Sequence, residues 1–92
     1  GVVVTLDPIT INLASGHYLK LGLSLQQTEK AHLEADGSKA LDLAIDLFSG
    51  RSISDLANRE KREKLKQELI EDIAEAYHHD VYTIYFTEFV WQ

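Results

Sequence analysis

The sequence predicts one small α+β domain in which two main helices pack on one face of a small mixed or antiparallel sheet. Segments typical of strands fill the first part of the chain and its end, and two helical segments lie between them, in the order β-β-β-α-α-β. Strands and helices do not alternate strictly, which favours an α+β arrangement over α/β. The 92 residues are enough for one core, so we expect a single domain over residues 1–92.

Three strands are expected before the first helix. Val2–Leu6 is apolar and β-branched, and Asp7-Pro8 interrupts it because proline cannot donate to a strand ladder. Ile9–Leu13 and Tyr18–Gln27 both alternate in character with period two. The residues between them, Ala14–Gly16, are typical of a turn, so we expect these two strands to form an antiparallel hairpin.

Tyr18–Gln27 is the clearest of the predicted strands. Its alternate positions carry Leu19, Leu21, Leu23 and Leu25, whereas the positions between them are mostly polar or small. A strand with one apolar and one polar face lies in a sheet that is covered on one side. We therefore expect the four leucines to face the core.

The first helix is expected at Lys39–Ser49. Ser38 is the residue type that favours a helix N-cap, and Gly50 is typical of the C′ position that ends a helix. The helix is apolar around most of its circumference, which indicates that it is largely buried. A short helical turn is expected at Ser52–Leu56.

The second main helix is expected at Arg59–Tyr77, with Asn58 as its N-cap. Its first half is rich in Lys and Arg and its second half in Glu and Asp, an order that opposes the helix macrodipole. The charges either form a merely solvated face or match the opposite charges of a neighbouring subunit or partner. The candidate contact residues on this helix are Lys61, Lys64, Glu68, Glu71 and Glu75.

Asp80–Gln92 is aromatic and β-branched and is expected to be the final strand. Simple alternation places every second residue from Val81 to Trp91 on one face, and neither of the resulting faces is plainly polar. The strand is then either enclosed within the fold or has a second contact surface. In the second case Tyr85 and Phe89 are the candidate contact residues.

The composition argues against several classes of function. The formal net charge of −6 disfavours nucleic acid as the main partner, because phosphate neutralisation needs a basic surface. There is no cysteine for thiolate catalysis or a Cys-type zinc site, and no two of the five glycines are close enough to form a phosphate-binding loop. We therefore expect no enzymatic activity and no cofactor.

The sequence His78-His79-Asp80 is the one cluster of potential metal ligands. Adjacent helical residues point about 100° apart, so one ion rarely binds both histidines. Histidines in the last turn of a helix instead interact favourably with the negative end of the helix dipole. No metal site is predicted, and a small metal- or ligand-binding module at this cluster is kept only as an alternative.

Several segments of the chain resemble a known family. They are Asn12-Leu13 followed by Tyr18-Leu19-Lys20, the helix end Leu47-Phe48-Ser49-Gly50-Arg51, the segment Ser54-Asp55-Leu56, the helical run Leu65-Lys66-Gln67-Glu68-Leu69 and, most specifically, the final strand with Tyr85-Phe86-Thr87-Glu88-Phe89. The chain resembles the C-terminal domain of FliL, the flagellar basal-body-associated protein, along nearly its whole length.

This resemblance implies a stomatin-like (SPFH) fold and a domain that lies in the periplasm, without the N-terminal anchor of a single-pass inner-membrane protein. It also implies a non-enzymatic role in the flagellar motor, in which copies associate, for example as a ring, around or beside the stator proteins MotA and MotB and support torque and motility. An SPFH-like membrane scaffold unrelated to flagella is the alternative that the residues leave open.

Overall fold

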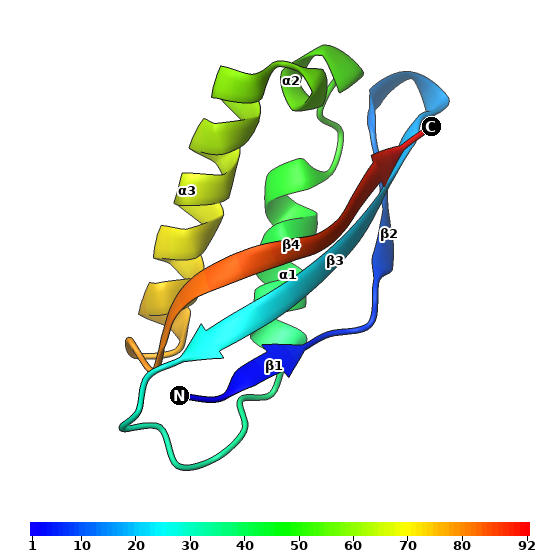
Figure 1. The fold of residues 1–92 in the computed structure, drawn as a ribbon. Helices are drawn as coiled ribbons and strands as arrows, with labels where there is room; N and C mark the ends of the chain where they lie inside the picture. The colour runs from blue at the N-terminus through cyan, green and yellow to red at the C-terminus, as the bar shows by residue number, and fades with distance from the viewer.

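The computed structural model describes all 92 residues and has the predicted α+β architecture (Figure 1). None of the helices combines the length and the apolar composition that a membrane-spanning segment needs. The elements in chain order are β1 (Val3–Thr5), β2 (Ile9–Asn12), a 3-10 turn η1 (Ala14–Gly16), β3 (Tyr18–Gln27), α1 (Ser38–Phe48), α2 (Ile53–Ala57), α3 (Arg59–Ala76) and β4 (Val81–Trp91).

β3 is the central strand of a four-stranded sheet that is antiparallel throughout. β4 pairs with β3 over nearly its full length, from Leu19 opposite Trp91 to Gln27 opposite Val81. β2 pairs with the first half of β3 and β1 with its second half, so both lie along the edge of β3 that β4 leaves free. The predicted hairpin of the second and third strands is confirmed, with Ile11 opposite Leu19.

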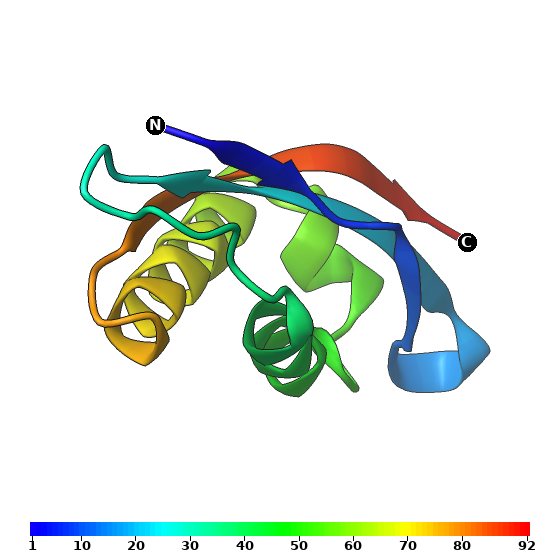
Figure 2. The ribbon, with the colours of Figure 1, turned by 90° about the horizontal axis from the view of Figure 1, so that it is seen from below.

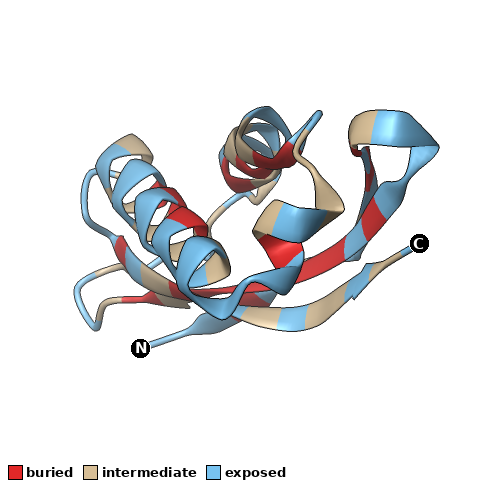
Figure 3. Cartoon of the chain, turned by 90° about the horizontal axis from the view of Figure 1, so that it is seen from above, coloured by how far each residue is buried: buried red, intermediate tan, exposed pale blue.

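All three helices lie on one face of the sheet, and the other face is uncovered (Figure 2). The four alternating leucines of β3 are fully buried beneath the helices, as their spacing predicts. The buried positions of α1 and α3 lie on the sides that face the sheet (Figure 3). These helix positions are Ala40, Ala44, Phe48, Leu65, Leu69 and Ile73.

β4 contains two β-bulges, which correct the sequence-based assignment of its faces. Gly22 lies opposite Glu88 while Leu23 lies opposite Phe86, so Thr87 is an extra residue in β4. A second register shift between Gln26 and Gln27 makes Tyr82 extra in the same way. Each extra residue reverses the alternation. The side chains opposite the core positions of β3 are Val81, Ile84, Phe86, Phe89 and Trp91.

Simple alternation along β4 was therefore wrong about which residues share a face. The strand has one apolar face toward the helices, and its outer face carries Thr83, Tyr85, Glu88 and Val90 opposite the outward positions of β3. The aromatic residues that made both faces look apolar are divided by the bulges. A sequence with period two cannot reveal a bulge, because the extra residue leaves no compositional mark of its own.

The helix ends are mostly as predicted. Asn58 is the N-cap of α3, and its side-chain oxygen accepts a hydrogen bond from the backbone N–H of Lys61 at 3.0 Å. Gly50 has a φ of 75° directly after the last turn of α1, which confirms its predicted role. Ser38, however, is the first residue of α1 and not its N-cap, which is Gly37. The prediction failed because Asp36, two residues earlier, binds the Ser38 side chain and backbone amide.

Candidate interaction surface

The five predicted contact residues of α3 form one exposed line along the helix. Lys61, Lys64, Glu68, Glu71 and Glu75 follow one another at intervals of three or four residues, and each of them is exposed. Such spacing places side chains on one face of a helix. We call these five residues the α3 stripe. Its two lysines precede its three glutamates, so the stripe changes sign along its length.

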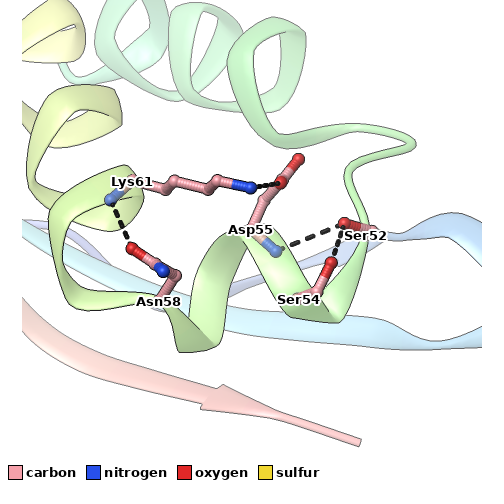
Figure 4. A network of polar contacts seen from close by, with 5 residues as sticks. All are labelled: Ser52, Ser54, Asp55, Asn58 and Lys61. Carbon is pink, nitrogen blue, oxygen red and sulfur yellow. Dashed lines mark hydrogen bonds and ion pairs between the residues drawn. The ribbon is translucent and has the colours of Figure 1, made fainter.

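Several cations in the first half of α3 bind within the domain. Lys61 lies 3.5 Å from the carboxylate of Asp55 in α2, and Figure 4 shows it reaching across from the start of α3. Arg62 donates to the carbonyl of Leu56 at 2.8 Å. The ammonium of Lys66 lies 5.2 Å from the ring centroid of Phe86. These contacts fix α2 and the sheet against α3, so the basic half of the helix is only partly available to a partner.

The remaining charges of the stripe have no ion partner in the chain. Lys64 forms no ion pair, and neither do Glu68, Glu71 and Glu75. Exposed surface charges of this kind contribute little to the stability of their own domain. The exposed surface of α3 is therefore predominantly acidic, with Lys64 as the free cation of the stripe.

The two candidate residues of β4 lie away from the stripe and away from each other. Tyr85 is 47% exposed on the uncovered face of the sheet, and its hydroxyl donates to Gln26 at 3.4 Å. Phe89 faces the helices, half-buried, and its ring packs edge-on against Phe48 with 5.9 Å between centroids. The structure thus brings together the five residues on α3 and separates them from both aromatic residues of β4.

The uncovered face of the sheet is a surface that the sequence did not single out. It carries the ion pair of Lys20 with Glu88, 3.3 Å apart, and the exposed apolar residues Val3 and Val90. Val90 is 52% exposed although it lies in the most apolar strand of the chain. Only the bulge at Thr87 puts Val90 on the same face as Tyr85, so simple alternation could not find this surface.

His78 and His79 follow the end of α3 and are exposed. Both have positive φ, 53° and 65°, and their backbone amides donate to the last free carbonyls of the helix, His78 to Glu75 at 3.1 Å and His79 to Ala74 at 2.8 Å. This is a Schellman motif with histidine where glycine is usual. No three His, Cys, Asp or Glu side chains lie together in an arrangement that could hold a metal ion.

The family model described as flagellar basal body-associated protein FliL matches residues 3–92. The chain belongs to the FliL family. The match begins at the first residue of β1 and continues past the last residue of β4, so it includes the α3 stripe and both edges of the sheet. The sequence resemblance to FliL is confirmed. No individually curated protein matches the chain.

Membership of the FliL family makes the chain a flagellar basal-body-associated protein. FliL is a structural component of the flagellum and is not a known enzyme family. Asp36, which precedes α1, and Tyr77, at the end of α3, both have a shifted pKa. Hydrogen bonds from Ser38 lower the pKa of Asp36, and burial raises the pKa of Tyr77. Both side chains hold the first turn of α1 in place.

Proposed function

We propose that this chain is a non-enzymatic interaction domain of the flagellar motor, which associates with copies of itself and with the stator proteins MotA and MotB to support torque and motility. The observation that carries the proposal is the α3 stripe, within a chain that belongs to the FliL family. A charged line of five exposed residues, four of them without an ion partner, is available to a partner of complementary charge.

The order of charges along the stripe suits an antiparallel helix of the same kind. In such a pairing Lys61 of one copy lies beside Glu75 of the other and Lys64 beside Glu71, while Glu68 meets Glu68 in the middle, so the four outer positions are complementary and the central one is not. Ion pairs at an exposed interface contribute modestly to affinity, but they select the register and reject partners with the wrong charge. A basic helix of a stator protein would satisfy the acidic half of the stripe in the same way.

In this proposal the domain lies in the periplasm, carried by a membrane anchor that precedes the residues described here. Tethering to a membrane raises the effective concentration of copies that share it. Weak contacts between domains, including those of a ring around the stator, can then form in the cell although the same domains separate in dilute solution.

A charge reversal at Lys64 tests the proposal. Lys64→Glu removes the free cation of the stripe and leaves the Lys61–Asp55 pair intact. The matched control is Lys30→Glu, which makes the same change of charge at an exposed residue of the β3–α1 loop. Each variant is expressed as the sole copy of the protein, and swimming motility, protein level and melting temperature are compared.

Reduced motility with Lys64→Glu, at normal protein level and melting temperature, supports the proposal if Lys30→Glu swims normally. Equal motility of the two variants would show that the α3 stripe is a solvated face. A double variant then identifies the partner. Lys64→Glu combined with Glu71→Lys restores the charge pairing between two copies but not with a different partner.

A further inference from the structure

The outer edge of β4 is open. β4 pairs with β3 only, so one side of its backbone from Val81 to Trp91 has no strand beside it. The opposite edge of the sheet is divided into two short strands by Asp7-Pro8, which is a common way to prevent pairing between sheets. β4 has no proline and only one charged residue, Glu88, whose carboxylate is paired with Lys20 at 3.3 Å.

The end of β4 is the part best suited to accept another strand. It is free of bulges after Thr87. Tyr18 and Gln92 exchange both backbone hydrogen bonds, at 2.9 and 3.0 Å. Because bonded and non-bonded pairs alternate in an antiparallel ladder, the backbone groups of Phe89 and Trp91 point to the open edge. A shallow hollow in the surface lies at the same place, lined only by Phe89, Val90 and Trp91.

We propose that this edge pairs with the same segment of a second copy of the chain, antiparallel, with Val90 on the twofold axis. The edge-facing backbone groups of Phe89 in one copy then bond those of Trp91 in the other, and the reverse, which gives about four new hydrogen bonds. The two sheets become one sheet of double width with the helices of both copies on the same side. The hollow is covered by the second copy.

The cross-strand neighbours in this register match well. Val90, 52% exposed in the single chain, lies opposite Val90 of the second copy. Phe89 lies opposite Trp91, and pairs of aromatic side chains are among the stabilising cross-strand pairs. Glu88 lies opposite the uncharged Gln92, so no like charges meet although each chain has a net charge of −6. Because the segment matches itself in this register, we assign a second copy of the chain as the occupant of the open edge.

The pairing deepens the self-association part of the proposed function and rests on that part, but it uses a surface separate from the α3 stripe. Strand pairing over a few residues buries less surface than a standard stable interface. The pair should therefore be weak and depend on concentration in solution. If the β4 edges do not pair but Lys64→Glu still impairs motility, only the β4 contact is rejected. The proposed role of the α3 stripe is then unaffected.

Cysteine crosslinking tests the register directly, because the chain contains no cysteine of its own. Val90→Cys places two thiols opposite each other at a non-hydrogen-bonded pair, where the Cα atoms are about 4.5 Å apart, within the range of a disulfide. The matched control is Val3→Cys, which is 50% exposed on the same face at the opposite edge of the sheet. Both purified proteins are exposed to a mild oxidant and followed on non-reducing gels.

Val90→Cys is expected to form disulfide dimers at least about tenfold faster than Val3→Cys, since pairing raises the local thiol concentration. Equal rates for the two variants would overturn the proposal. In cells, an adduct of Val90→Cys with a different protein in place of the dimer would overturn it as well, because the edge would then have another occupant.

A charge at the twofold axis gives the second test. Val90→Glu places a carboxylate opposite Lys20 of the same chain, which favours the folded monomer. When two copies pair through β4, the same change sets their two carboxylates against each other. Sedimentation should show self-association about tenfold weaker than in the wild type. Val3→Glu makes the same change of net charge and should leave self-association unchanged. Equal weakening by both variants would contradict pairing through β4.

Discussion

The hydroxyl of Tyr77, at the end of α3, accepts a hydrogen bond from the backbone amide of Ala40 at 3.1 Å and thereby caps the first turn of α1. The same hydroxyl donates to the carbonyl of Asp36 at 2.5 Å. The N-cap position of α1 is Gly37, which has no side chain to do this. A residue from another helix therefore supplies the acceptor that an N-cap Ser or Asp usually provides.

Removing the Tyr77 hydroxyl should destabilise the domain. Tyr77→Phe keeps the ring in place and leaves the Ala40 amide without its acceptor, which we expect to cost about 1 kcal/mol. For a domain of this size the melting temperature should fall by about 4–8 °C. The control is Tyr82→Phe, at an exposed tyrosine. Thermal unfolding followed by circular dichroism measures both, and equal melting temperatures would contradict the capping role.

The pH dependence of stability should also identify Tyr77. Burial raises the pKa of this phenol in the folded state, so in alkaline solution the unfolded chain loses its proton first. The stability that the protonated hydroxyl contributes is fully present below about pH 10, the ordinary pKa, and is lost as the pH rises through the higher folded pKa. The difference in melting temperature between wild type and Tyr77→Phe should therefore shrink above about pH 10. A difference that stays constant to higher pH would contradict this.

The end of α3 stores backbone strain that glycine should relieve. His78 has a φ of 53° at the C′ position, where a side chain is unfavourable. His78→Gly should stabilise the domain by about 1 kcal/mol. The reciprocal change is Gly50→Ala, at a φ of 75° after α1, and it should destabilise by a similar amount. Urea unfolding of both variants checks the two signs, and destabilisation by His78→Gly would mean that its side chain makes a contact worth more than the strain.

The bulge at Thr87 depends on a glycine in the neighbouring strand. A Cβ atom on Gly22 would lie 2.5 Å from the Thr87 hydroxyl and 3.3 Å from the Cβ of Glu88. Gly22→Ala should therefore destabilise the domain by about 1–3 kcal/mol, a usual cost of overpacking. The cost should be smaller in a Thr87→Ala background, where the nearest clashing atom is absent. A double-mutant cycle measures the coupling, and additive effects of the two changes would contradict the contact.

Much of the fold could be predicted because particular residues have strong local preferences for the structure that they form. The leucines of β3 alternate without a bulge, and Asn58 and Gly50 have the residue types that their helix ends require. The faces of β4 could not be predicted, since Thr87 and Tyr82 become extra residues only through pairing with β3. The cap of α1 was missed for the same reason, because its acceptor comes from a distant helix.

The candidate surface, too, could be predicted only in part from the sequence. The α3 stripe follows from helical spacing alone, so its five residues lie together as the sequence suggested. That Lys61 would bind Asp55, or that Tyr85 and Phe89 would lie on opposite faces of β4, depends on tertiary contacts and on a bulge. Val90 likewise lies on the uncovered face of the sheet only because of this bulge.

The central claim is that the α3 stripe contacts another protein of the motor, and crosslinking in living cells tests it most directly. A photo-reactive amino acid replaces Glu68, the middle residue of the stripe, and Asp46, an exposed residue of α1, is the control position. We predict that position 68 gives an adduct with a second copy or a stator protein and that position 46 gives none. Adducts of equal yield at both positions, or no adduct at position 68 in swimming cells, would contradict the claim.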